Sequence, residues 1–165
     1  LPPSPPVVIR DSKALSLKQR ELAAAWITQH ALAWAVGEAS VAEITALNIL
    51  RASHLAMRRA VDALAVTPEL LLVDGREGRI HLKVPAVSLI NGDQICFSIA
   101  AASIIAKVHR DALMRALDLR HPGYGLDAHK GYGSAAHLAA LRELGASPCH
   151  RPTYAPVRAA ALTER

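Results

Sequence analysis

The pattern of hydrophobic and polar positions predicts a chain that alternates short buried strands with amphipathic helices. Two apolar runs, residues 70–74 and 86–90, are short, rich in branched side chains and followed by glycine turns, as is typical of buried strands. Each run leads into an aspartate, Asp74 or Asp93. A further strand is predicted over residues 31–39, where bulky and small side chains alternate.

Helices are expected around these strands, and their starts carry recognisable capping signals. Ser16 with Gln19, and Ser40 with Glu43, have the spacing of capping boxes. The predicted helices begin at Ser16 and at Ser40, cover residues 48–64, 98–119 and 135–144, and recur near the C-terminus, with shorter strands possible at 7–9 and 80–82. The pattern therefore predicts an α/β fold with few strands.

The two aspartates are the first candidates for chemistry. Open α/β sheets build their sites at the carboxyl ends of strands, where Asp74 and Asp93 are expected. The alternative is structural, because Asp-Gly and Asn-Gly-Asp are ordinary turn sequences. Carboxylate oxygens suit Mg²⁺ or Mn²⁺, which nucleases use for displacement at phosphorus. The pair indicates metal-assisted cleavage of a phosphodiester, although such a site normally contains more than two acids.

Composition narrows the choice of partners. The chain has 165 residues, 52% of them hydrophobic, and is expected to be a single domain, residues 1–165. A net charge of +5 favours a polyanionic partner. No apolar stretch reaches the roughly 18 residues of a membrane span. Cys96 and Cys149 form no disulfide framework, which indicates a reducing compartment, so we expect a cytoplasmic location. We also expect a monomer with no membrane partner.

Two lysines and one serine, Lys13, Lys107 and Ser12, are candidate contacts for such a partner. Ser12 and Lys13 precede a capped helix and could hold a phosphate, or form an ordinary turn. Ser103 and Lys107 share a helical face, where the lysine is better suited to binding a phosphate or a carboxylate than to activating the serine.

A glycine-rich loop at residues 122–134 is the last candidate. Its glycines allow the backbone to approach a ligand, and the ring of Tyr132 can stack on a sugar or base, or simply pack in a surface turn. The spacing of His121, His129 and His137 fits no common zinc motif, so we expect no histidine metal site.

Taken together, these segments resemble bacterial ribonuclease HII, the type 2 ribonuclease H. The resemblance runs in order from about Asp11 to Val157. It is carried by Asp11-Ser12-Lys13, Trp34-Ala35-Val36-Gly37-Glu38-Ala39-Ser40, Asn48-Ile49-Leu50, residues 55–61, Val73-Asp74-Gly75, Gly92-Asp93, residues 100–108, Pro122-Gly123-Tyr124-Gly125, His129-Lys130-Gly131-Tyr132 and His150-Arg151.

The resemblance implies a ribonuclease H-like mixed sheet flanked by helices, with a small helical C-terminal region. It implies cleavage of RNA in RNA–DNA hybrids, and of single ribonucleotides in duplex DNA, on the 5′ side of the ribonucleotide. Asp74 and Asp93 would be catalytic ligands of Mg²⁺ or Mn²⁺, and Tyr132 would pack on the sugar at the RNA-to-DNA junction. The remaining substrate contacts would be Ser12, Lys13, Lys107 and Lys130.

One family motif has no counterpart in this sequence. The family begins with a strand carrying Asp-Glu-Ala-Gly-Arg-Gly, which supplies two further acids and the loop that reads the 2′-hydroxyl, and no such run occurs here. We therefore expect an N-terminally truncated fold and impaired cleavage. The alternative is a catalytically dead, nucleic-acid-binding remnant of the same family.

Overall fold

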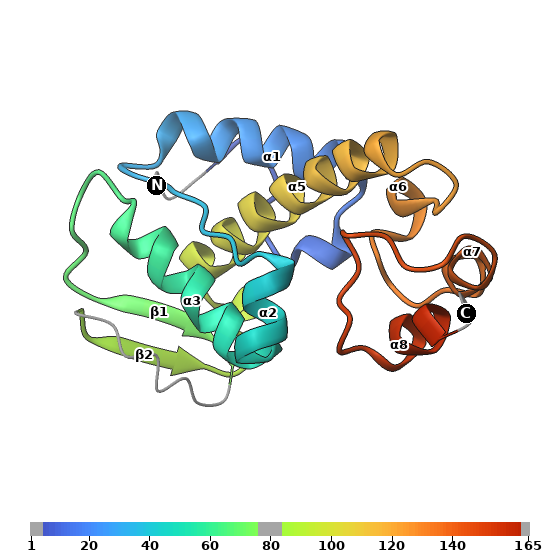
Figure 1. The fold of residues 1–165 in the computed structure, drawn as a ribbon. Helices are drawn as coiled ribbons and strands as arrows, with labels where there is room; N and C mark the ends of the chain where they lie inside the picture. The colour runs from blue at the N-terminus through green and yellow to red at the C-terminus, as the bar shows by residue number, and fades with distance from the viewer. Residues whose placement is uncertain (1–4, 76–83, 163–165) are drawn as a thin grey trace. The chain divides into compact units, whose positions relative to one another are not determined.

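The computed structural model describes residues 5–75 and 84–162, which form two compact units. The first unit comprises residues 1–38 and 53–109, and the second comprises residues 39–52 and 110–165. Two long helices, α3 (Ile49–Asp62) and α5 (Phe97–Arg120), run from one unit into the other (Figure 1). No helix among the described residues is both long enough and apolar enough to cross a membrane.

The first unit contains a small parallel sheet. Strand β1 (Leu71–Asp74) pairs with strand β2 (Ala86–Leu89), so that Leu71 lies opposite Ala86 and Asp74 lies opposite Leu89. Both predicted strands are therefore confirmed, and each is one residue shorter than predicted. The two described strands are parallel, and the short strand expected at residues 80–82 lies outside the described residues.

The core of the first unit lies between α1 (Leu17–His30) and α5. Small and branched side chains form it: Leu15, Ala23, Ala24, Ile27, Ala101, Ile104 and Ile105. Ser16 caps α1 with a complete capping box, as its spacing with Gln19 predicts. The alanines let the two helices pack closely against each other.

The strand predicted over residues 31–39 is wrong, because none of these residues belongs to a strand. The carbonyl of Glu38 instead accepts a hydrogen bond from the guanidinium of Arg59 on α3, at 2.7 Å. A Cβ at Gly37 would lie 2.0 Å from the carbonyl oxygen of Ala56 in the same helix. This segment is pressed against a helix backbone, and its alternation of bulky and small side chains reflects that contact. Trp34, expected to point inward, is 49% exposed.

The second unit is helical around its own core. It contains α2 (Val41–Leu47), α6 (Leu126–His129), α7 (Ala135–Leu144) and α8 (Ala155–Leu162). Helix α7 begins at the Ser134 cap and ends at Gly145, whose positive φ suits glycine. Its core residues are Met114, Tyr124, Leu126, Leu141, Val157 and Ala160. The helix predicted near the C-terminus is thus confirmed as α8.

Three short elements were not predicted from the sequence. They are a 3-10 turn, η1 (Ser12–Ala14), the single-turn helix α4 (Gly92–Ile95), and α6. Each spans fewer residues than one period of the hydrophobic pattern needs to become visible. Two of them carry candidate site residues, so the sequence locates those residues along the chain without fixing their local geometry.

Candidate functional site

Asp74 is the last residue of β1, and its carboxylate reaches the turn that follows β2. Its Oδ1 accepts a hydrogen bond from the backbone N–H of Gly92, at 2.8 Å. The turn is shaped by Asn91, which adopts the left-handed conformation with φ 54°. Gly92 is buried there, and a Cβ on it would meet Ile99 Cδ1 at 2.5 Å and Asp74 Oδ1 at 3.4 Å. The absence of a side chain at Gly92 therefore leaves room for Ile99 against this turn, while the Gly92 N–H holds the Asp74 carboxylate.

The sequence predicted Asp93 at the end of a strand, and this prediction is wrong. Strand β2 ends at Leu89, and Asp93 lies in the first turn of α4, half-buried. Asp93 nevertheless remains next to the residue that holds Asp74. Gly92, which binds the carboxylate of Asp74, directly precedes Asp93 in the chain. The carboxylate of Asp74, from the end of β1, is therefore bonded to the residue next to Asp93.

The donor chemistry of this turn fits a divalent ion that keeps part of its hydration shell. Within residues 5–75 and 84–162, no group of three or more His, Cys, Asp or Glu side chains could hold a metal. Asp74 and Asp93 together offer carboxylate oxygens, which are ligands that Mg²⁺ and Mn²⁺ favour. Mg²⁺ commonly binds through one or two carboxylates and completes its shell with water and phosphate oxygens. Two acids therefore suit an ion shared with a phosphate substrate.

Ser12 and Lys13 lie together in the 3-10 turn of the first unit but face different surroundings. Ser12 is 4% exposed, and its Oγ lies 3.0 Å from the Oγ of Ser103 on α5. Lys13 is exposed, and its backbone N–H is held by the Asp11 carboxylate at 2.9 Å. The Lys13 side chain is thus accessible to solvent, whereas the Ser12 hydroxyl is buried against Ser103. The Ser103 hydroxyl faces Ser12, and Lys107 is half-buried on α5.

Lys130 and Tyr132 lie in the second unit, on the loop between α6 and α7. The Lys130 ammonium binds the Asp127 carboxylate, and this hydrogen bond lowers the pKa of Asp127. The carbonyl of Lys130 accepts from Arg110 Nη2 at 3.0 Å. Tyr132 is 69% exposed, which leaves its ring accessible for stacking. The predicted site residues therefore divide between the two units.

A cluster of histidines beside this loop was missed as functional by the sequence reasoning. His129 and His137 stack with ring centroids 4.2 Å apart, and His137 Nε2 lies 3.1 Å from His150 Nε2. Burial lowers the pKa of both His137 and His150. His121, His129 and His137 recur every eight residues and fit no zinc motif, whereas His150 follows His137 by 13 residues, so the sequence did not indicate a hydrogen bond between those two rings. The position of His129 and His137 on either side of Tyr132 was the available signal.

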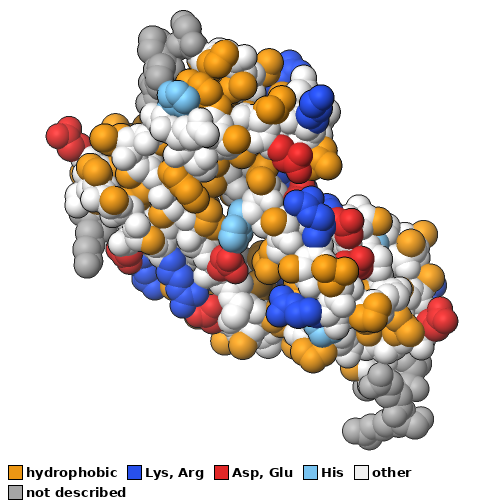
Figure 2. All heavy atoms as spheres, turned by 90° about the horizontal axis from the view of Figure 1, so that it is seen from above, with side chains coloured by type: hydrophobic (Ala, Val, Ile, Leu, Met, Phe, Trp, Pro, Cys, Tyr) orange, Lys and Arg blue, Asp and Glu red, His pale blue; other side chains and the backbone are white. Residues whose placement is uncertain are grey.

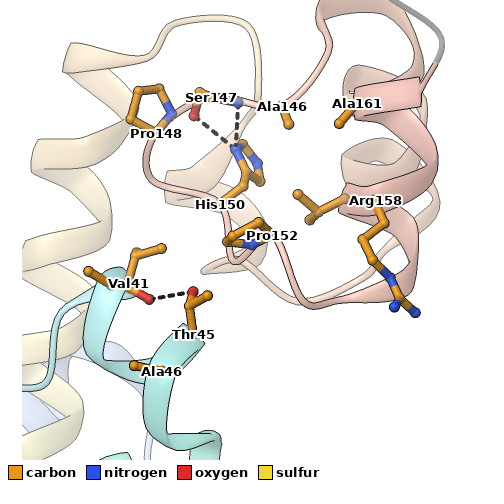
Figure 3. Close-up of a pocket in the computed structure, with 12 residues that line it drawn as sticks. Val41, Thr45, Ala46, Ala146, Ser147, Pro148, His150, Pro152, Arg158 and Ala161 are labelled. Atoms are coloured by element: carbon orange, nitrogen blue, oxygen red, sulfur yellow. Dashed lines mark hydrogen bonds between the residues drawn. The ribbon is translucent and has the colours of Figure 1, made fainter.

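His150 also borders a hollow in the second unit (Figure 3). The cavity measures about 1010 Å³ and is lined mainly by small apolar side chains from α2, α8 and the segment between α7 and α8. Polar contributions come from Thr45, Ser147 and Arg158 as well as His150. On the face seen in Figure 2, the described acidic and basic side chains are interspersed among hydrophobic ones, so the positive net charge is not gathered into one patch there.

Comparison with known proteins decides the family. Residues 6–157 match the family model described as Ribonuclease HII. The chain belongs to the ribonuclease HII family. Ribonuclease HII of Neisseria meningitidis serogroup C (strain 053442) is 51% identical over 150 residues, covering 91% of this chain and 77% of that protein. Ribonuclease HII of Halorhodospira halophila is 53% identical over 152 residues, covering 91% and 78%.

The fold comparison agrees with the ribonuclease HII assignment. The crystal structure of the ribonuclease H2 from Pyrococcus horikoshii OT3 aligns with a TM-score of 0.82 at 22% identity, covering 94% of this chain and 81% of that one. The ribonuclease H-like α/β fold expected from the resemblance is thus confirmed. The ribonuclease HII family is in general dependent on divalent metal ions. The roles of the individual site residues, and the expected truncation, stay predictions.

Proposed function

We propose that this chain is a ribonuclease H-type endonuclease that cleaves RNA in RNA–DNA hybrids and single ribonucleotides embedded in duplex DNA. Cleavage would fall on the 5′ side of the ribonucleotide and leave 3′-hydroxyl and 5′-phosphate ends. The observation that carries the proposal is the hydrogen bond from Gly92 to Asp74, which brings two acids to one turn. Membership of the ribonuclease HII family supports the reaction class.

The proposed site binds a divalent ion, Mg²⁺ or Mn²⁺, through Asp74 and Asp93. Such an ion, when bound, activates water and stabilises the leaving oxyanion in displacement at phosphorus. The chain's own part is to hold the carboxylates in place. The Gly92 N–H fixes one oxygen of Asp74, and α4 fixes the backbone of Asp93. The Asp74 side chain then does not have to be ordered when the ion and substrate arrive.

Each unit carries proposed substrate contacts of its own. Tyr132 presents an exposed ring to the sugar at the RNA-to-DNA junction, and Lys13 is the most accessible phosphate contact of the first unit. Lys130, on the loop after α6, and Lys107, on α5, would contact the nucleic-acid backbone. Ser12 would act indirectly, because its buried hydroxyl supports the turn that presents Lys13.

We also propose that these 165 residues by themselves cleave slowly. The sequence contains no Asp-Glu-Ala-Gly-Arg-Gly run, so two of the acids expected in the family are absent from it. Fewer carboxylates offset less of the hydration energy of the ion and leave it more weakly held. A second function, binding of ribonucleotide-containing duplex without cleavage, follows if the ion is too weakly held for turnover.

The test is a product map on a labelled DNA duplex that contains one ribonucleotide, with the protein in excess and Mn²⁺ present. We expect slow cleavage on the 5′ side of the ribonucleotide and no cleavage of an all-DNA duplex. Asp74→Asn should abolish cleavage, because the amide keeps the Gly92 hydrogen bond but loses the negative charge. Glu69→Gln is the matched control, since it removes one exposed carboxylate outside the proposed site.

Two results would overturn the endonuclease proposal. One is cleavage that persists in Asp74→Asn, and the other is cleavage of the all-DNA duplex at a similar rate. Multiple turnover at a rate comparable to the Neisseria relative would contradict the proposed impairment alone. Binding that prefers the ribonucleotide duplex, without any cleavage, would select the second function.

A further inference from the structure

The main-chain carbonyl of Tyr132 is held by two hydrogen bonds. One comes from the backbone N–H of Ser134, at 2.8 Å, and the other from Nδ1 of His137, at 2.9 Å. A carbonyl oxygen has two lone pairs, so both are used. Because the Tyr132 ring is exposed, its position depends on how firmly this backbone is held. The second bond links the loop to the interior of the second unit.

The hydrogen bonds around His137 define the tautomer of each ring. The backbone N–H of Ser147 donates to Nδ1 of His150 at 3.1 Å, so a neutral His150 carries its hydrogen on Nε2. That Nε2–H donates to Nε2 of His137 at 3.1 Å. His137 then carries its hydrogen on Nδ1 and donates it to the Tyr132 carbonyl. The result is one directed series of bonds from Ser147 to Tyr132, in which both rings are neutral.

His129 supports the same loop from the other side. Its Nδ1 accepts the N–H of Gly131 at 3.2 Å, and its Nε2 donates to the carbonyl of Tyr124 at 2.7 Å. Its ring stacks on that of His137. A neutral form again satisfies both nitrogens. His129 and His137 therefore both make hydrogen bonds with the backbone of the segment that carries Tyr132.

The other ionisable groups near the two buried rings do not stabilise a charge on them. His150 lies beside Cys149 and against the ring of Tyr124, and it lines the hollow shown in Figure 3 with Arg158. The positive charges of neighbouring histidines, His121 and His129 among them, oppose protonation of His150. Burial has the larger effect and lowers the pKa of both His137 and His150.

We propose that His137 and His150 are positioning residues that hold the Tyr132 loop in its substrate-binding conformation through this directed series of hydrogen bonds. The inference rests on the proposed function, because it assigns them to the residue expected to contact the RNA-to-DNA junction. Protonation of His137 places an N–H on Nε2, facing the N–H of His150. Protonation of His150 places an N–H on Nδ1, facing the N–H of Ser147. Either event places two N–H groups against each other and breaks the series. The Tyr132 carbonyl, still bonded to Nδ1 of His137, is then no longer linked to Ser147.

The first test uses the wild-type chain and reads the loop without any substrate. Nitrogen-15 imidazole shifts should show hydrogens on Nδ1 of His137 and on Nε2 of His150 at pH 7.5. The backbone resonances of Tyr132 should then change in step with protonation of these rings as the pH falls toward 5. Resonances of Tyr132 that stay constant while both rings become protonated would overturn the proposal, as would the opposite tautomers.

The second test compares variants by their affinity for a duplex with one ribonucleotide, relative to an all-DNA duplex. His137→Ala should weaken that preference about tenfold, because the loop is no longer held in the binding geometry. His137→Asn keeps a donor near the Nδ1 position and should retain most of the preference without the pH dependence. Ala139→Asn, an exposed change on the same helix, is the matched control and should behave as wild type.

Tyr132→Ala distinguishes failure of the positioning role of His137 from failure of the proposed function. If it weakens the preference for the ribonucleotide duplex and a folded His137→Ala does not, the positioning role is wrong and the proposed function stands. If Tyr132→Ala has no effect, its place in the proposed function is wrong and the positioning role falls with it. If His137→Ala does not fold, His137→Asn decides the matter. Loss of the preference for the ribonucleotide duplex in that variant contradicts the proposal.

Discussion

Gly92 is the residue on which the geometry of the proposed site depends most directly. Its N–H binds Asp74, and its lack of a side chain leaves room for Ile99, whose Cδ1 would lie 2.5 Å from a Cβ at this position. The space is filled by its neighbours, since Ile99 is 7% exposed. The backbone at Gly92 is therefore in close contact with the Ile99 side chain and is bonded to the Asp74 carboxylate.

Gly92→Ala should both destabilise the chain and disturb the site. The new Cβ would lie 2.5 Å from Ile99 Cδ1, so Ile99 or the turn must move. Overpacking of this kind costs about 1–3 kcal/mol, which urea unfolding would measure. Gly133→Ala is the control, because a Cβ there meets no atom within 4 Å. Equal stabilities for the two variants would contradict the packing argument.

The buried histidines make a pH prediction with a definite sign. The pKa of His137 and of His150 is lowered in the folded chain, mainly by burial, below the usual value of about 6.5 that applies when the chain is unfolded. Below that pH the unfolded state binds more protons than the folded state. The free energy of unfolding should thus be constant above about pH 7 and fall as the pH decreases through the window below 6.5.

Denaturant unfolding at a series of pH values checks this prediction. A variant with both His137→Asn and His150→Gln should show a shallower decrease, whatever its absolute stability. Asp127 does not interfere, because its lowered pKa places its titration at more acidic pH. A free energy of unfolding that rises as the pH is lowered from 7 to 5.5 would contradict the prediction.

Sequence reasoning at this scale identified Asp74 and Tyr132 but not the residues that support them. An acid at the end of an apolar run is visible in the sequence, and so is a tyrosine among glycines. The bond between Asp74 and Gly92 spans 18 positions, and that between His137 and His150 spans 13. Contacts of this kind depend on how elements pack, and no local pattern encodes them.

Among the elements, helices with capping signals were predicted better than the strands. Ser16 and Ser40 start α1 and α2 as their spacing indicates, because a capping box is formed entirely by neighbouring residues. Residues 31–39 alternate like a strand but lie against α3, where Arg59 binds the Glu38 carbonyl. A strand needs a partner for its backbone, and alternation alone does not show whether one exists.

Gly37→Ala tests the contact that replaced the expected strand. The Cβ would lie 2.0 Å from the Ala56 carbonyl oxygen and 2.5 Å from the Ala60 nitrogen. Both are backbone atoms of α3, so no side-chain rotation relieves the clash. We expect a loss of about 3 kcal/mol in unfolding free energy, at the upper end for overpacking. A circular-dichroism melt would detect it, and an unchanged melting temperature would contradict this packing of Gly37.

At the scale of the whole molecule, the order of motifs was a better guide than composition. Net charge suggested only a polyanionic partner, whereas the motifs between Asp11 and Val157 indicated the family that residues 6–157 match. The α/β class was visible from alternating strands and helices. The division into two compact units was not, because α3 and α5 continue from one to the other without a break in their patterns.

The central claim is that Asp74 and Asp93 share one divalent ion, and sub-stoichiometric Mn²⁺ in an NMR experiment tests it most directly. Paramagnetic broadening should affect the amides of both aspartates, Gly75 and Gly92 together. Asp74→Asn and Asp93→Asn should each remove the broadening at both places, whereas Glu69→Gln should leave it unchanged. Broadening that survives around one aspartate when the other is replaced, or that never reaches this turn, would contradict a shared ion.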